Sequence, residues 1–251
     1  MKHILSIVNH KGGVGKTTTA VNLAAAIGES GQRVLVVDFD PQGSASMYLG
    51  IESDGKDLLD ALASTSALPV VKNVADGVDL VPAGLRLIDA RQRFTSALGV
   101  DLLDRCLQRT DGDWDWVIID CPPSMGVLTL AGLRAGHEVI IPVEANYLAL
   151  KGLYQLLEFL RSLKHKIKDI DIVGLVPCRA QPRRRIHQEI MDQLAQQFPG
   201  KVAPAVRENV SLAEAPGRGK PVTVCMPHSH GAEDYRQIAQ WLLANFEPST
   251  A

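Results

Sequence analysis

His10-Lys11-Gly12-Gly13-Val14-Gly15-Lys16-Thr17-Thr18 stands between an apolar run, Ile4–Val8, and a stretch of helical periodicity, Lys16–Glu29. Glycines in such a loop let backbone N–H groups turn inward, and the helix N-terminus adds partial positive charge, so the loop suits a phosphate. Lys16 can reach β- and γ-phosphates, and the Thr17 hydroxyl can ligate Mg²⁺. The alternative is a glycine-rich turn that only caps a helix. Such a turn would not require a strand, a Gly-Lys-Thr sequence and a helix to follow one another in register, as they do here.

The loop departs from the common G-x-x-x-x-G-K-[ST] pattern, because His10 stands where that pattern has glycine and Lys11 adds a second lysine. Lys11 is too far from its own β/γ-phosphate cradle to repeat the role of Lys16. We expect it to project away and to neutralise phosphates bound by a facing subunit, as an arginine finger does in trans. This second lysine is the signature of the deviant Walker loop.

Two carboxylates follow the next apolar run, Val34–Val37. Asp38 and Asp40 are two residues apart, so the alternation of a strand predicts that they point to the same side. Either can hold water, one near Mg²⁺ and the other near the attacking nucleophile. A turn formed by Asp40-Pro41 is the structural alternative.

A third apolar run, Val117–Ile119, ends in Asp120 and is followed by Cys121-Pro122-Pro123. It matches a Walker B strand, in which the aspartate holds Mg²⁺ through water. The two prolines would stiffen a loop next to the γ-phosphate. An apolar strand that ends in Asp is common, so this motif gains its weight from the other two.

Short β-branched runs alternate with helical patterns along most of the chain, which predicts an α/β fold: a single doubly wound, mostly parallel sheet with helices on both faces. Ligands of such folds bind at the carboxyl ends of the strands. No repeat, low-complexity linker or boundary interrupts the pattern, so we expect residues 1–251 to form one domain. The expected strands are Ile4–Val8, Val34–Val37, Val78–Val81, Val117–Ile119, Val139–Val143 and Ile172–Val176. The expected helices are Lys16–Glu29, Leu98–Gln108, Gly126–Ala135, Leu150–Leu163 and Ala232–Phe246.

Composition supports an ordinary globular protein, with 46% apolar and 22% charged residues. The first apolar run is too short for a signal peptide, and no stretch reaches the length of a membrane span. The four cysteines form no C-x-x-C pair, which argues against a disulfide framework or a zinc site and favours the cytosol. The net charge of −2 hides an asymmetry: Arg161–Lys220 holds twelve Lys and Arg against six Asp and Glu.

The three motifs, in this order and spacing, resemble the ParA/MinD family of deviant Walker P-loop ATPases, and the details favour its ParA/Soj branch of DNA-partitioning ATPases. The resemblance extends from Ile4 to about Tyr235. The segments that carry it are Lys11–Ala24, Asp38–Gly43, Asp120–Ser124, Arg207–Pro216, Gly219–Pro221 and Gly231–Tyr235.

The resemblance implies ATP and Mg²⁺ as cofactors. Lys11, Lys16 and Asp40 would be the catalytic residues, with Lys11 crossing a dimer interface and Asp40 positioning or activating water. Thr17, Asp38 and Asp120 would organise Mg²⁺. The adenine would lie between Val176–Arg179 and Pro204–Arg207. The nucleotide-binding residues would be Lys11, Gly12, Gly13, Val14, Gly15, Lys16, Thr17, Thr18, Cys178, Arg179, Pro204, Val206 and Arg207.

The resemblance also implies partners. ParA-like proteins dimerise with ATP, bind non-specific double-stranded DNA through basic residues of the C-terminal half, and respond to a ParB-like activator or cargo adaptor. We expect a cytoplasmic, nucleoid-associated protein with no membrane partner. The candidate DNA-binding residues are Arg183, Arg184, Arg185, Arg207, Arg218 and Lys220. A solvated helix start is the alternative for the run of three arginines.

The chain departs from the family at Glu144, because the more usual Gln-x-Glu arrangement places the acid two positions later. His228 and His230 stand where arginine is commoner, and no helix-turn-helix segment precedes Met1, so sequence-specific repression is not expected.

Three other functions are alternatives. Membrane cycling of the MinD type requires a basic amphipathic C-terminal helix, and no Lys or Arg follows Arg236. An iron–sulfur reductase requires exposed cysteines, whereas Cys106 and Cys121 lie in apolar patterns. A scaffold that only holds ATP would have no need of Asp40.

Overall fold

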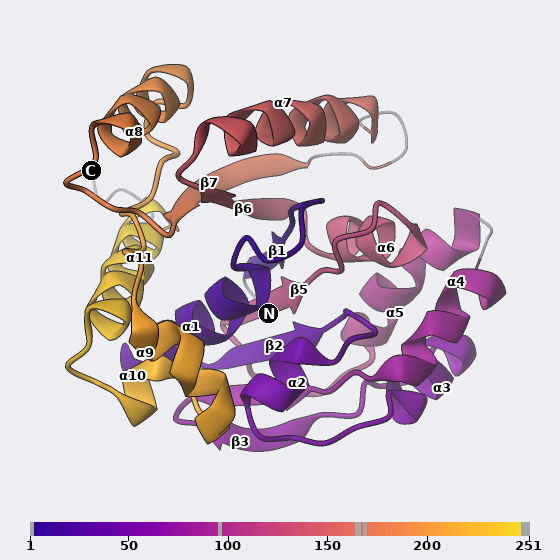
Figure 1. Cartoon of the computed structure of the whole chain (residues 1–251). Coiled ribbons are helices and arrows are strands. Elements are labelled where there is room, and N and C mark those ends of the chain that lie inside the picture. Colours follow the sequence, from indigo (N-terminus) through magenta and orange to yellow (C-terminus); the bar gives the residue numbers. More distant parts are fainter. Residues whose placement is uncertain (1–2, 95–96, 164–166, 168–169, 247–251) are drawn as a thin grey trace, which may run out of the picture.

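The computed structural model of the chain describes residues 3–94, 97–163, 167 and 170–246. The strands that it describes form one seven-stranded sheet in the order β3-β4-β2-β5-β1-β6-β7 (Figure 1). Neighbouring strands are parallel except β3 and β4, which are antiparallel. The strands are β1 His3–Ile7, β2 Val34–Asp38, β3 Val71–Ala75, β4 Val78–Val81, β5 Trp116–Asp120, β6 Glu138–Glu144 and β7 Asp171–Cys178.

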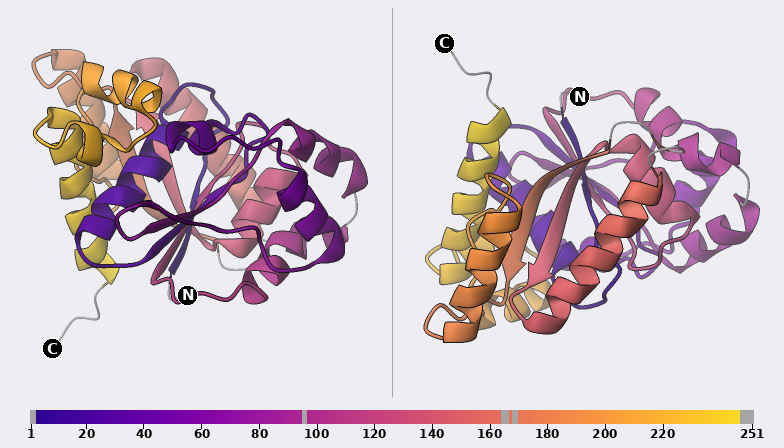
Figure 2. Two further views of the ribbon diagram at one scale, coloured as in Figure 1. Left: turned by 90° about the horizontal axis from the view of Figure 1, so that it is seen from below. Right: turned by 90° about the horizontal axis from the view of Figure 1, so that it is seen from above.

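Helices cover both faces of the sheet, and each face has its own apolar core (Figure 2). One core contains residues of α1, α2, α10 and α11, and the other contains residues of α3, α5, α6, α7 and α8. The helices are α1 Lys16–Glu29, α2 Ser44–Tyr48, α3 Lys56–Ser64, α4 Ala90–Arg93, α5 Leu102–Gln108, α6 Val127–Ala135, α7 Tyr147–Ser162, α8 Arg185–Gln197, α9 Val210–Glu214, α10 Val222–Cys225 and α11 His230–Phe246. Short 3₁₀ turns are η1 Leu85–Asp89, η2 Ala97–Asp101 and η4 Ala215–Arg218.

The central strands explain why the sequence forms this sheet. Every residue of β2 and β5 is buried, because helices pack on both sides of these strands. Near-continuous apolar strands are typical of parallel sheets covered on both faces. The prediction of a doubly wound, mostly parallel sheet is therefore confirmed, and all six expected strands are present.

The differences from the expected elements are local. The strand β3 was not predicted, because it lies at the sheet edge and exposes Lys72 and Asn73. The expected helix Leu98–Gln108 begins as the turn η2 and becomes α-helical only at Leu102. The helices α2, α3, α4, α8, α9 and α10 were also absent from the expected set.

Strand order places the candidate site. From β1 the chain moves to β2 and β4 on one side of the sheet and later to β6 and β7 on the other. The carboxyl end of β1 is therefore the switch point at which doubly wound folds bind ligands. Of the helices that the structure describes, none has the length and apolar character that a bilayer span requires.

Candidate nucleotide site

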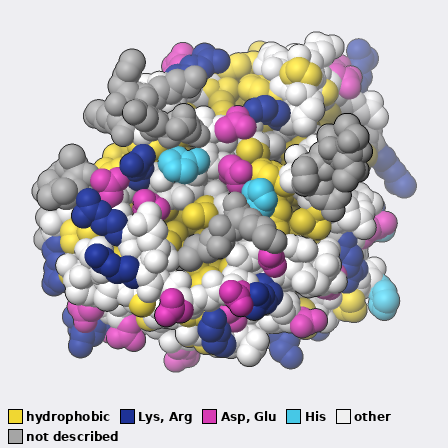
Figure 3. All heavy atoms as spheres, turned by 180° about the vertical axis from the view of Figure 1, so that it is seen from behind, with side chains coloured by type: hydrophobic (Ala, Val, Ile, Leu, Met, Phe, Trp, Pro, Cys, Tyr) yellow, Lys and Arg dark blue, Asp and Glu magenta, His cyan; other side chains and the backbone are white. Residues whose placement is uncertain are grey.

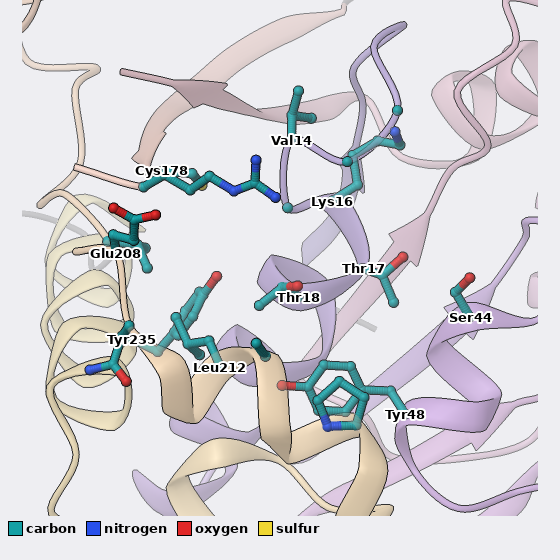
Figure 4. A pocket seen from close by; sticks show the side chains of 18 of the residues that line it. Val14, Lys16, Thr17, Thr18, Ser44, Tyr48, Cys178, Glu208, Leu212 and Tyr235 are labelled. Atoms are coloured by element: carbon teal, nitrogen blue, oxygen red, sulfur yellow. The ribbon is translucent and has the colours of Figure 1, made fainter. Parts of the chain in front are cut away.

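A cavity of about 820 Å³ lies beside the glycine-rich loop, between α1, α2 and the C-terminal helices (Figure 4). This volume lies within the range of about 300–1,000 Å³ that small-molecule sites occupy. The loop lines it with residues 12–18, the segment after β2 contributes Asp40, and α2 contributes Ser44, Met47 and Tyr48. The C-terminal part contributes Cys178, Arg179, residues 206–210, Leu212, Ala213, Pro216 and Tyr235.

The loop backbone takes a shape that only glycine adopts readily. Gly13 has φ 73° and Gly15 has φ 97°, both in the left-handed region. Helix α1 begins directly after Gly15, with no side-chain cap and no acidic residue in its first turn. The positive end of the helix dipole and its first N–H groups are thus available to an anion in the cavity.

Lys16 supplies the cation of this cradle. Its side chain is almost fully buried, and Nζ donates to the carbonyl oxygen of Lys11 at 3.1 Å. Burial lowers the pKa of Lys16, and the carboxylates of Asp120 and Asp40 act in the opposite direction. A phosphate beside this ammonium would add a further anion that favours its charged form.

The arrangement of Thr17 and Asp120 suits a hard cation. The Thr17 hydroxyl donates to Oδ2 of Asp120 at 2.7 Å, which holds the two side chains side by side. The other oxygen of Asp120, Oδ1, is buried and has no hydrogen-bond partner. A hydroxyl and a carboxylate with a free oxygen are the donors that Mg²⁺ takes beside phosphate and water oxygens. The residues present therefore fit Mg²⁺.

Asp38 lies next to this pair. Its Cα is opposite that of Asp120 in the register of β2 and β5, and its carboxyl accepts hydrogen bonds from the N–H and hydroxyl of Ser46 at 2.8 and 2.7 Å. Burial, followed by the charge of Asp38, raises the pKa of Asp120 to about 8, and burial raises that of Asp38 to about 6. A divalent cation would favour the ionised form of both groups.

Asp40 has a different environment from Asp38. The strand β2 ends at Asp38, so strand alternation does not reach Asp40. Asp40 lines the cavity, and one of its carboxylate oxygens accepts the N–H of Gln42 at 3.1 Å. The carboxylate is thus held at the cavity wall, where it can accept a proton from a water molecule.

Lys11 does not line the cavity. Its Nζ lies 2.9 Å from Oε2 of Glu144, at the end of β6, and its side chain is 48% exposed. The backbone N–H of Lys11 donates to the side chain of Asn9 at 3.0 Å. The two lysines of the loop therefore have separate environments, as their spacing predicted.

The C-terminal wall of the cavity agrees only in part with the predicted adenine site. Cys178, Arg179, Val206 and Arg207 line the cavity, whereas Pro204 does not. Sequence reasoning missed several lining residues, among them Ser44, Met47, Tyr48, Leu212 and Tyr235. The resemblance drew attention to residues 208–216 and to Tyr235 as family motifs but did not assign them to the nucleotide site.

Hydrogen bonds join this wall to the loop helix. The Tyr235 hydroxyl lies 3.2 Å from that of Thr19. Asn22 donates to the Tyr48 hydroxyl at 2.9 Å and accepts the N–H of Val222 at 2.7 Å. Residues about 200 positions apart are thus fixed around one cavity.

Arg207 requires a correction to the predicted DNA-binding set. Its guanidinium pairs with the buried carboxylate of Asp234, with Nη2 2.6 Å from Oδ1, and also with Glu233. These hydrogen bonds raise the pKa of Arg207. Two carboxylates already compensate its charge, so we remove Arg207 from the DNA-binding candidates and keep it at the cavity wall.

The other predicted DNA-binding residues are exposed. Arg183 and Arg184 lie between β7 and α8, and Arg185 pairs with Glu189 on the first turn of α8. Arg218 lies 3.8 Å from Glu214, and Lys220 is exposed in the following turn. On the face that Figure 3 shows, which is the back of the view in Figure 1, Lys and Arg side chains are interspersed with Asp and Glu in the parts not drawn grey. Lys164, Lys166 and Lys168, which contribute to the basic balance of the segment, lie outside the described residues.

Comparison with known proteins agrees with this geometry. A family model described as an AAA domain matches residues 2–172. The sporulation initiation inhibitor protein Soj of Bacillus subtilis is 38% identical over 260 residues, covering 98% of this chain and 100% of the relative. The chromosome-partitioning ATPase Soj of Thermus thermophilus is 36% identical over 245 residues, covering 97% and 96%. Among solved structures, cobyrinic acid a,c-diamide synthase from Mycobacterium smegmatis with a bound ATP analogue and magnesium is similar to this chain, with a TM-score of 0.83. The two sequences are 32% identical, and the match covers 98% of this chain and 96% of the synthase.

Proposed function

The chain belongs to the ParA/Soj family of P-loop ATPases, and on that premise we propose that it is a partitioning ATPase that works as an ATP-switched dimer on DNA. The observation that carries the proposal is the separation of the two loop lysines: Lys16 is buried at the cavity, and Lys11 lies outside it. One lysine can hold the nucleotide of its own chain while the other remains free to reach a second chain.

The cavity residues divide the work of hydrolysis among them. Bound Mg²⁺ would supply positive charge that offsets the negative charge developing on the phosphates during hydrolysis. Thr17 and Asp120 would hold it, with Asp38 beside them. Asp40 would accept a proton from the attacking water, or orient that water toward the γ-phosphate.

Dimerisation would complete the site. Lys11 is exposed, and its ammonium would reach the phosphates of a facing chain, where transition-state charge develops. A single chain therefore binds nucleotide but hydrolyses it slowly.

DNA binding is proposed for Arg183, Arg184, Arg185, Arg218 and Lys220, which are exposed and belong to the basic segment. Two chains joined by ATP present twice as many cations to one duplex, so the dimer would bind far more tightly than the monomer. A ParB-like activator or cargo adaptor would stimulate hydrolysis and release DNA, in the cytoplasm at the nucleoid. The cargo would be a chromosome, a plasmid or a protein assembly.

The structure argues against the membrane-cycling alternative. The apolar side chains of α11 that such a mechanism would insert into lipid include Tyr235, Ile238 and Leu242, all at most 1% exposed. These side chains pack in the core shared with α1 and are not available to a bilayer. The last residues, 247–251, lie outside the described part of the chain.

The test is a mobility-shift titration of random-sequence duplex DNA with the full chain, in ATP and in ADP, at several salt concentrations. We expect binding in ATP that weakens steeply with salt, and little binding in ADP. Equal binding in both nucleotides, or none in either, would reject the DNA switch. Parallel sedimentation with anionic lipid vesicles examines the membrane alternative, and ATP-dependent sedimentation with them would favour that function instead.

A further inference from the structure

The ammonium of Lys11 is held inside its own chain. Nζ lies 2.9 Å from Oε2 of Glu144, and the side chain of Glu144 is 21% exposed. The contact follows from the sheet, because β1 and β6 are parallel neighbours. The loop that leaves β1 therefore passes the carboxyl end of β6, where Glu144 is the last residue.

Glu144 has a second cation available. Nη1 of Arg179 lies 3.5 Å from Oε1, the carboxylate oxygen that Lys11 does not occupy. Arg179 follows β7 and lines the cavity, and its φ of 53° holds the backbone in the left-handed region. Glu144 thus lies between the lysine outside the cavity and an arginine at its wall. Its hydrogen bond with Lys11 is the largest cause of a lowered pKa for this carboxyl, so the group is ionised at neutral pH.

We infer that Glu144 is a positioning residue that restrains Lys11 within the monomer and so opposes dimerisation. This inference rests on the proposed function, in which Lys11 acts on the phosphates of a facing chain. To act there, the ammonium must leave a carboxylate 2.9 Å away. While Glu144 pairs with it, the ammonium of Lys11 is compensated within its own chain and attracts the phosphates of a partner less strongly than a free ammonium would.

Arg179 makes it possible for Lys11 to leave Glu144. When Lys11 leaves, the guanidinium at Oε1 still compensates the carboxylate, so Glu144 is not left as an isolated anion. The restraint is therefore weak enough to be reversed. A half-exposed ion pair of this kind changes an equilibrium by a factor of about 2–5, and a dimer breaks two of them, which gives about 4–25-fold.

The experiment compares Glu144→Gln with the full-length parent. Analytical ultracentrifugation with a non-hydrolysable ATP analogue and Mg²⁺ measures the dimer dissociation constant, and a fluorescent-ADP titration measures nucleotide affinity of the monomer. We expect dimerisation about 4–25-fold tighter with ADP affinity unchanged. Tighter dimerisation is a gain that damage to the fold would not produce.

The matched control is Glu158→Gln, which removes the same charge from an exposed position on α7, several turns beyond Glu144. This control should dimerise like the parent. Raising the salt concentration should narrow the difference in dimer dissociation constant between Glu144→Gln and the parent. Salt screens the Lys11–Glu144 ion pair in the parent, and the variant has no such pair to screen. Should Glu144→Gln unfold, Glu144→Asp shortens the side chain by one methylene and must still tighten the dimer.

The outcomes separate the two ideas. If the parent dimerises with the ATP analogue and the Glu144→Gln variant dimerises no more tightly than the parent, the restraint is overturned and the proposed function stands. A parent that stays monomeric while Glu144→Gln dimerises supports the restraint. Failure of both proteins to dimerise with the ATP analogue overturns both ideas.

Discussion

Asp38 and Asp120 stand opposite each other at the carboxyl ends of β2 and β5, and both carboxyl groups are buried. Of the two, only Asp120 has an oxygen without a partner, because Ser46 donates to Oδ2 of Asp38 and the N–H of Asp40 donates to its Oδ1. Two neighbouring buried carboxyls repel each other once ionised. The nucleotide-free protein therefore contains a local electrostatic cost that a divalent cation would relieve.

This cost predicts a pH dependence of stability. Burial, followed by the charge of Asp38, raises the pKa of Asp120 to about 8, and burial raises the pKa of Asp38 to about 6. A raised pKa in the folded state stabilises the protein at low pH, and the stabilisation is lost as pH rises through the folded pKa. Without nucleotide and Mg²⁺, we expect the melting temperature to fall between pH 5 and pH 8.5.

The control for this measurement is Asp120→Asn, which cannot ionise. A differential of one pKa unit is about 1.4 kcal/mol, and each kcal/mol shifts the melting temperature of a chain this size by about 2–4 °C. Differential scanning fluorimetry measures the melting temperature of both proteins across this pH range. We expect it to fall by several degrees less in the variant than in the parent. The same slope in both proteins would show that other groups cause the decline.

The Lys16→Ala variant should lose nucleotide binding. The buried ammonium is the cation that lines the cavity at the loop, and removal of one partner from a desolvated charge contact costs at least about 2–3 kcal/mol, roughly 100-fold in affinity. Titration with a fluorescent ATP analogue measures the loss. Affinity close to that of the parent would refute the assignment of the phosphate loop.

Lys11→Ala should behave differently from Lys16→Ala, because Lys11 lies outside the cavity. We expect the monomer to bind ATP with parental affinity and to fail in dimer formation and in hydrolysis. Light scattering with ATP and a phosphate-release assay examine the two steps. Normal dimers of Lys11→Ala would remove the role of this lysine in a facing chain.

Asp40→Ala should bind ATP and remain dimeric, since the carboxylate is proposed to act on water rather than on nucleotide. Loss of a general base lowers turnover by about 10²–10⁴-fold. Single-turnover hydrolysis measures the effect apart from product release. Turnover within a factor of about two of the parent would transfer the role to another carboxylate.

Arg184→Ala combined with Arg218→Ala should weaken DNA binding and leave ATP-driven dimerisation unchanged. Each lost phosphate contact makes the slope of log affinity against log salt shallower by about 0.9. The matched control is Arg33→Ala, an exposed arginine that pairs with Asp113 and lies outside the basic segment. If the control flattens the slope as much as the double variant does, the DNA contacts lie elsewhere.

The sheet could be predicted from sequence because its strands are buried on both faces. An apolar run such as Val34–Val37 has few alternatives to a covered parallel strand. The missed elements lack this signal. The strand β3 lies at an edge with exposed polar residues, and α8 buries only Ile190 and Leu194 among its thirteen residues.

The candidate site likewise contains residues that local sequence patterns reveal and residues that they do not. The loop, Asp40 and Asp120 could be singled out because each follows or ends an apolar run, and their residue types suit phosphate and metal chemistry. Tyr48 and Leu212 line the cavity only because the fold brings α2 and α9 to it, which no local pattern states. The pairing of Arg207 with Asp234 likewise joins residues 27 positions apart, so local charge counting treated this arginine as free.

The span of the nucleotide cavity along the chain has a consequence for biosynthesis. The loop lies within the first 20 residues, whereas the opposite wall comes from residues 206–216 and Tyr235. A ribosome releases the phosphate loop and most of the sheet before it has made that wall, and the apolar side of α1 stays uncovered until α11 emerges. Nascent chains therefore pass through a stage in which an apolar helix face is exposed, and the complete nucleotide cavity exists only once translation has continued past Tyr235.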